Sequence, residues 1–174
     1  MKNEYGFAML EVLISLLLIL IGVLGLAGLQ LMSINNTESA RYQSLAVMLA
    51  SNMASEIQAN TAYWYPTAPA NIVVNGAAIT GGPTWASTCT TAACSAPQMA
   101  ANDLLNWGTA IANTLPGGNA TVACTNVTAP TVCTLTLLWT EKNIALSNPT
   151  GSETGQLASG TAQTHQYQTL VAVQ

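Results

Sequence analysis

The chain has 174 residues, of which 50% are hydrophobic and only 6% are charged. Soluble domains carry roughly 25% charged residues, so this chain is unusually poor in charge. Three basic residues against seven acidic ones leave a net charge of −4, and so few cations cannot neutralise a phosphate backbone. The composition therefore argues against nucleic-acid binding as the main role. It suits a surface that is exposed outside the cell or packed against identical neighbours.

An apolar segment covers residues 7–29 and holds a single charge, Glu11. As a helix it would be roughly 35 Å long, enough to cross a bilayer. A cleaved secretory signal would have a shorter apolar core with a small-residue cleavage site after it, whereas here the small residue, Gly6, precedes the core. A carboxylate at the middle of a membrane helix costs roughly 2.5–3.5 kcal/mol, so Glu11 calls for a specific role.

The helical pattern continues beyond the apolar segment, since no proline occurs before Pro66. We therefore predict one long helix over residues 7–60, with a transmembrane half at 7–29 and an amphipathic second half. The apolar positions of the second half recur at helical spacing: Leu45, Met48, Leu49, Met53 and Ile57.

Residues 61–174 are expected to form an exported globular head. Asn75–Gly76, between short apolar runs, predicts a hairpin with a type I′ turn. Ser95 followed by Gln98 predicts a helix with a capping box. This helix should end at about Thr114, before Pro-Gly-Gly, and bury one side: Leu104, Trp107, Ile111 and Leu115.

The rest of the head is predicted to contain three strands, over the runs "ATVACTNV", "TVCTLTLLWT" and "QYQTLVAVQ". The second run alternates, and its apolar face consists of Cys133, Leu135, Leu137 and Trp139. The polar, Gly-rich residues 141–163 are expected to form a loop. The prediction is an α+β fold, in which a long N-terminal helix packs on a small antiparallel sheet with one extra helix.

All four cysteines lie beyond the apolar segment, and an even number in an exported region predicts two disulfides. We predict Cys89–Cys94 and Cys124–Cys133, because each pair is local and the second would join adjacent strands. A zinc site would require closely spaced Cys or Cys/His pairs. The only histidine, His165, is remote from the cysteines, so the spacing favours disulfides over metal.

Gly6, Phe7 and Glu11, followed by a long apolar helix, resemble the processing site of the type IV pilin superfamily. The resemblance implies that a prepilin peptidase cuts between Gly6 and Phe7, removes residues 1–6 as a leader and methylates the new N-terminal Phe7. The family commonly has Thr-Leu-Ile before the glutamate, where this chain has Ala-Met-Leu at 8–10. In pilin assemblies this glutamate pairs with the terminal amine of a neighbouring subunit, which implies an assembly role for Glu11.

The head resembles the minor pilins of the PilV type. The pattern consists of an Asp-x-x-x-Trp helix at Asp103 and Trp107, Leu-Pro-Gly-Gly at 115–118, and a strand containing Trp139. The resemblance implies a pilin-like fold and a minor pilin that helps initiate or cap type IV pilus assembly, with adhesion or motility downstream. Two alternatives stay open: a type II secretion pseudopilin, which shares the processing site, and a signal-anchored periplasmic binding domain.

The sequence contains no catalytic constellation. Glu141 lies two residues after Trp139 and Asp103 opens a helix, but neither has a paired acid or base by spacing. We therefore expect no enzymatic activity, no cofactor and no metal.

The resemblance also implies where the chain acts and what it contacts. The expected partners are prepilin peptidase, other minor and major pilins, the inner-membrane pilus assembly machinery, and membrane lipid before assembly. The chain would cross the inner membrane once, with its head in the periplasm, and then move to the pilus on the cell surface.

Overall fold

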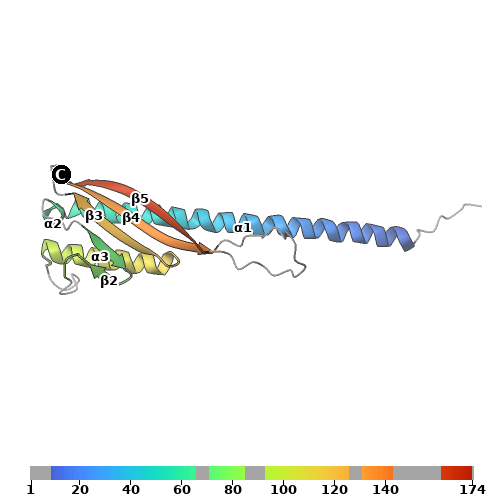
Figure 1. Ribbon diagram of the computed structural model, residues 1–174, viewed down its shortest axis with the longest axis horizontal. Helices are drawn as coiled ribbons and strands as arrows, with labels where there is room; N and C mark the ends of the chain where they lie inside the picture. The colour runs from blue at the N-terminus through green and yellow to red at the C-terminus, as the bar shows by residue number, and fades with distance from the viewer. Residues whose placement is uncertain (1–8, 66–70, 85–92, 126–130, 143–161, 174) are drawn as a thin grey trace, which may run out of the picture. The chain divides into compact units, whose positions relative to one another are not determined.

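The computed structural model describes residues 9–65, 71–84, 93–125, 131–142 and 162–173 (Figure 1). The chain divides into two units, Met1–Glu38 and Ser39–Gln174. Helix α1 (Met9–Ala59) begins in the first unit and ends in the second. The predicted α+β fold is confirmed, with a long apolar N-terminal helix, one further long helix and an antiparallel sheet.

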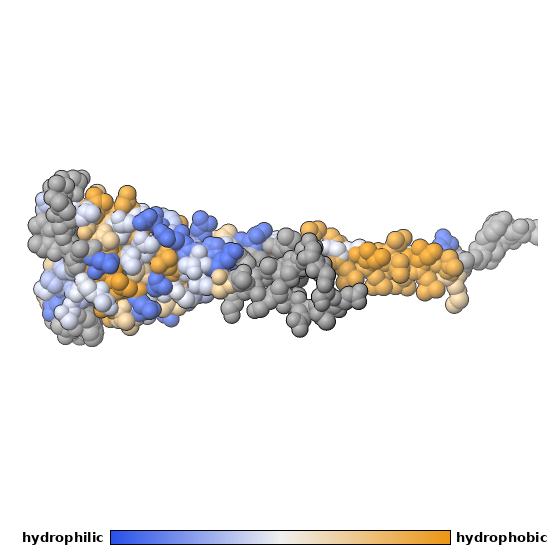
Figure 2. Space-filling view, in the orientation of Figure 1, coloured by the Kyte–Doolittle hydropathy of each residue, from blue (hydrophilic) through white to orange (hydrophobic). Residues whose placement is uncertain are grey.

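In the first unit, α1 contains the stretch Met9–Gln30, which is long and apolar enough to cross a membrane. Its large apolar side chains are exposed, Leu13 by 68% and Leu24 by 72% for example. They form the continuous apolar surface along this part of α1 in Figure 2. Exposing so much apolar surface to water is unfavourable, and the stretch therefore fits a membrane anchor.

The second unit contains a sheet of five strands in the order β2-β1-β3-β4-β5, and every neighbouring pair is antiparallel. Two helices, the short α2 and the long α3, belong to the same unit. The elements are α2 (Thr61–Trp64), β1 (Ile72–Asn75), β2 (Ala78–Thr80), α3 (Ala96–Thr114), β3 (Asn119–Thr125), β4 (Thr131–Lys142) and β5 (Ala162–Val173).

One face of the sheet is buried, because the side chains of the central strands alternate between the core and the surface. The predicted apolar face of β4 is confirmed, since Cys133, Leu135, Leu137 and Trp139 are all buried. They share one core with the buried residues of β3, which are Ala120, Val122 and Cys124.

Both long helices contribute to this core. The predicted side of α3 is buried as expected: Leu104, Trp107, Ile111, and Leu115 just after the helix. The buried face of α1 is Ala46, Leu49, Ala50, Met53 and Ile57. Met48, which the sequence suggested for this face, is 52% exposed. The face instead includes two alanines, Ala46 and Ala50. Hydropathy alone does not identify them, because their side chains are small.

The ends of α3 follow the predicted signals. The Ser95 backbone N–H and hydroxyl donate to Gln98 Oε1 at 2.9 and 3.0 Å. After the helix, Gly117 takes a positive φ of 63°, a conformation that favours glycine. The backbone N–H of Thr140 in β4 donates to the Pro116 carbonyl at 2.9 Å, so the turn after α3 is fixed to the sheet.

The β1–β2 hairpin forms, but the predicted type I′ turn at Asn75–Gly76 is wrong. Asn75 belongs to β1 and pairs with Ala78, so the two turn residues are Gly76 and Ala77. Of these, only Gly76 has a positive φ, 57°, whereas a type I′ turn requires two. A glycine at the first turn position is the requirement of type II′.

Strands β4 and β5 are longer than predicted. The structure extends β4 to Lys142 and begins β5 at Ala162, so both ends of the predicted loop at 141–163 are strand. The middle of that loop, 143–161, lies outside the described residues.

Candidate functional site

The N-terminal part of the candidate site contains Glu11, in the first turn of α1. Negative charge at this end of a helix is favoured by the helix dipole. It is the only charged residue of Met9–Gln30, and no described residue forms an ion pair with it. Gly6 and Phe7, the residues of the predicted cleavage site, lie outside the described residues.

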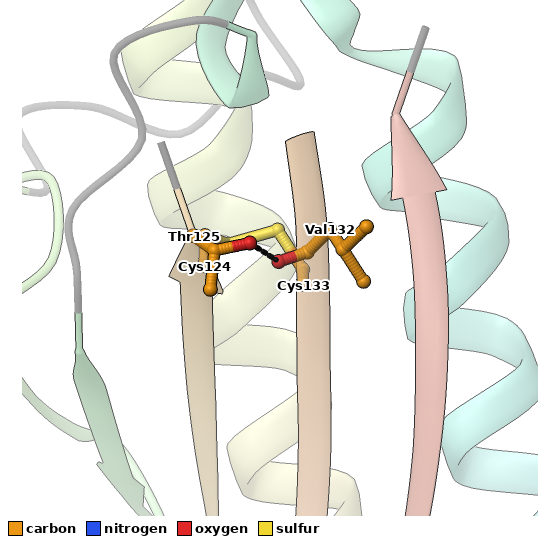
Figure 3. The surroundings of a disulfide bond; sticks show 4 residues. All are labelled: Cys124, Thr125, Val132 and Cys133. Carbon is orange, nitrogen blue, oxygen red and sulfur yellow. Dashed lines mark hydrogen bonds between the residues drawn. A yellow bond between two sulfur atoms is a disulfide. The ribbon is translucent and has the colours of Figure 1, made fainter. Parts of the chain in front are cut away.

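The head contains a disulfide between Cys124 and Cys133 (Figure 3). These residues face each other in the register of β3 and β4 and are both buried. Beside them, Thr125 Oγ1 donates to the Val132 carbonyl at 3.1 Å. Cys94 is also disulfide-bonded. Because its predicted partner Cys89 lies outside the described residues, that pairing stays a prediction.

Two hydrogen bonds hold α3 against α1. Trp107 Nε1 donates to the Leu49 carbonyl at 2.9 Å, and Asn60 Nδ2 donates to the Ala96 carbonyl at 2.8 Å. Trp107, late in α3, thus meets Leu49 of α1, whereas Ala96, at the start of α3, meets Asn60 just after α1 ends. The two helices therefore run antiparallel along this contact. Asn60 is 5% exposed. Sequence reasoning missed it, because a single Asn at a helix end carries no periodicity signal.

A pair of carboxyl groups lies along the same contact, Glu56 on α1 and Asp103 on α3. Glu56 Oε2 is buried and has no hydrogen-bond partner among the described residues. Burial raises the pKa of Glu56 to about 7, and the charge on Asp103 contributes to the increase. Burial also raises the pKa of Asp103. Spacing in the sequence suggested no partner for Asp103, since the pair forms only when the two helices pack.

A second polar cluster lies where β4 and β5 pair. Trp139 Nε1 donates to Glu141 Oε1 at 2.6 Å, and the other carboxylate oxygen lies 3.6 Å from His165 Nε2. The Trp139 and His165 rings stack at 5.7 Å. The sequence predicts that Glu141 and Trp139 share a side of the strand, but it does not indicate that His165 lies beside them. His165 is identified only by the strand register, which places it opposite Trp139.

The carboxylate of Glu141 is buried, and one of its oxygens accepts a hydrogen bond from the Trp139 indole. A cavity of about 230 Å³ is lined by uncharged residues of the hairpin region and α3, including Ile79, Pro83 and Leu105. Within the described ranges, no three His, Cys, Asp or Glu residues gather as metal ligands would.

These features define a class of protein with a long N-terminal helix, apolar enough at its start to cross a membrane, and a disulfide-bonded α+β head. Two family models match the chain. The prokaryotic N-terminal methylation motif matches residues 1–27, and the model described as type IV pilin Tt1218 matches residues 28–105. The chain is a type IV pilin with a prepilin-type N-terminus, and hence a structural subunit rather than an enzyme.

The methylation motif implies processing by a prepilin peptidase and assembly into pili with other pilins. No curated protein and no solved structure matches the chain.

Proposed function

We propose that this type IV pilin is a minor pilin of the PilV type that helps to initiate or cap pilus assembly. The observation that carries the proposal is the methylation motif over residues 1–27, in which Glu11 is the one charge of an otherwise apolar helix. The head pattern at Asp103, Trp107, 115–118 and Trp139 supports the PilV type. Trp107 and the 115–118 turn both have fold roles, since one binds α3 to α1 and the other joins α3 to the sheet.

In this proposal, cleavage between Gly6 and Phe7 removes the leader at 1–6, and the new N-terminal Phe7 is methylated. The amine of Phe7 then carries a positive charge. Glu11 of one subunit pairs with the Phe7 amine of its neighbour within the membrane. A lone carboxylate costs roughly 2.5–3.5 kcal/mol there, whereas opposite charges attract strongly at low dielectric. Glu11 thus favours the correct longitudinal register as subunits are added.

The proposed topology follows from the pilin resemblance together with the apolar stretch of α1. Residues 7–29 cross the inner membrane once, as part of a helix over 7–60, and the head at 61–174 lies in the periplasm. There the subunit meets the inner-membrane assembly machinery, and it then joins other minor and major pilins at the cell surface. Adhesion or motility would be consequences of the pilus as a whole.

Mass spectrometry of the mature N-terminus in sheared pili tests the processing. We expect an N-methylated Phe7, and an intact Met1 in assembled material would contradict the proposal.

Deletion of the gene tests the assembly role. We expect fewer pili with normal protein secretion. Loss of secretion with normal pili would instead indicate a type II secretion pseudopilin, and no effect on either would indicate an anchored binding domain.

A further inference from the structure

The contact between α1 and α3 holds two acidic side chains between its hydrogen bonds. Glu56 of α1 lies between Leu49 of the same helix and Asn60, which directly follows it, and these two residues form hydrogen bonds to α3 of 2.9 and 2.8 Å. On α3, Asp103 lies between the matching partners, residues 96 and 107. The two carboxyl groups are therefore held near each other by contacts that do not depend on their own charge.

The surroundings of Glu56 do not stabilise a negative charge. Its Oε2 atom is buried, and no described residue donates a hydrogen bond to it. The charge on Asp103 acts on it as well and has the same sign. Tyr63 on the adjacent α2 is the other titratable group with a shift in this region, and burial raises its pKa to about 12, so it stays neutral near pH 7. An ionised Glu56 would thus be a half-buried charge, one of whose oxygens is shielded from water and receives no hydrogen bond from a described residue.

We propose that Glu56 and Asp103 form a pH-sensitive contact that controls how tightly α3 docks on α1. When Glu56 is protonated, its side chain is neutral, and neither the burial of Oε2 nor the charge on Asp103 opposes the docking of the two helices. When Glu56 loses its proton, its charge is repelled by that of Asp103, and the hydrogen bonds on either side hold the helices together against this repulsion.

The direction of the effect follows from linkage. Burial raises the pKa of Glu56 from 4.5 to about 7 in the folded head, so the folded state binds a proton that the unfolded state has already released. The stabilising contribution is complete below about pH 4.5 and is lost as the pH rises through about 7. Asp103 acts in the same direction, since burial raises its pKa too. The docking of α3 is therefore weakest under alkaline conditions.

The test is thermal unfolding of the full chain in detergent between pH 5 and pH 9, with EDTA present to exclude bound divalent cations. We expect the wild-type Tm to fall as the pH rises. Glu56→Gln should flatten that dependence and raise the Tm at pH 9, by roughly 4 °C or more. Asp103→Asn should move the midpoint of the transition to lower pH, because one cause of the raised Glu56 pKa is removed.

Glu38→Gln is the matched control, because Glu38 is an exposed glutamate of the same helix. It should retain the wild-type pH profile. The proposal is overturned if the wild-type Tm does not depend on pH, or if Glu56→Gln keeps the wild-type slope.

A second measurement on the wild type covers the case in which Glu56→Gln fails to fold. Hydrogen exchange, corrected for its intrinsic pH dependence, should show more frequent opening of α3 at pH 9 than at pH 5, with β4 unchanged. Equal protection of α3 at both pH values would also overturn the proposal.

Discussion

The indole N–H of Trp107 donates to the backbone carbonyl of Leu49 at 2.9 Å, although the two residues are 58 positions apart. A helical carbonyl already accepts the N–H four residues later, so the indole uses its second lone pair. Trp107 is 4% exposed, and its hydrogen bond is shielded from water. A single side chain thus adds a directional contact to the hydrophobic packing of α3 on α1.

The first prediction compares two buried tryptophans. Trp107→Phe removes this hydrogen bond together with part of the ring, whereas Trp64→Phe removes part of a ring whose Nε1 has no partner among the described residues. We expect Trp107→Phe to lower the free energy of unfolding by about 1–2 kcal/mol more than Trp64→Phe does. Denaturant unfolding of both variants in detergent measures the difference. An equal loss would show that the indole hydrogen bond contributes nothing beyond ring volume.

The second prediction concerns Gly108, in the middle of α3. A Cβ at this position would overlap the backbone oxygen of Gly76 and a methyl group of Val74. Alanine favours a helix over glycine by about 1 kcal/mol, yet Gly108→Ala should destabilise the head, because a backbone carbonyl in a tight turn cannot move aside. Gly25→Ala is the control, since its Cβ would meet nothing within 4 Å. A Tm of Gly108→Ala at or above the wild-type value would contradict the close packing.

Local signals predicted the elements of the fold well. Alternation along β4, the Ser95 and Gln98 cap and the apolar side of α3 each depend on neighbours within a few residues, and each is present in the structure. The hairpin was also predicted correctly, but the predicted turn type was wrong. Asn-Gly fits a type I′ turn when both residues are central, and the pairing of Asn75 with Ala78 moved the turn by one residue.

Contacts between distant segments could not be predicted in the same way. The charge on Asp103 acts on Glu56 only because the two helices pack, and Trp139 stacks on His165 only because of the strand register. Neither arrangement leaves a pattern in the linear sequence. Gly108 did leave one, since glycine inside a helical pattern often indicates close packing.

The third prediction concerns the disulfides. Replacing Cys124 and Cys133 together by Ala should lower the free energy of unfolding by about 2–4 kcal/mol, because the bridge restricts the unfolded chain. Unfolding of the double variant, compared with the wild type under non-reducing conditions, measures the loss. Peptide mapping without reduction should recover Cys124 joined to Cys133, and Cys89 joined to Cys94. A peptide that links Cys89 to Cys124 would overturn both assignments.

The fourth prediction concerns Glu141, whose buried carboxylate accepts the Trp139 indole N–H at 2.6 Å. Glu141→Gln keeps an oxygen acceptor there, whereas Glu141→Leu leaves a buried N–H without a partner. We expect Glu141→Leu to be the less stable of the two by about 1–3 kcal/mol. In a Trp139→Phe background the difference should shrink, because the donor is gone. A difference that persists in that background would assign the effect to packing.

The last prediction tests the proposed assembly role of Glu11. Glu11→Leu makes the apolar stretch of α1 more hydrophobic, so membrane insertion should be retained, and cleavage should also continue. Entry into the pilus should fail, because the attraction to the neighbour's amine is lost. Glu11→Gln should fail in the same way, since it keeps the shape and loses the charge. The measurement is the amount of each variant in sheared pili relative to its amount in the inner membrane.

Two comparisons make this test decisive. A simple membrane anchor predicts that both substitutions are silent or mildly stabilising, because removing a charge from an apolar helix lowers the cost of insertion. Ser15→Ala is a matched control one turn further along α1, because it removes a hydroxyl that bonds the Val12 carbonyl at 2.8 Å without altering charge. It should enter pili normally. If Glu11→Leu enters pili as well as Ser15→Ala does, Glu11 has no pairing role, even though the chain is a type IV pilin.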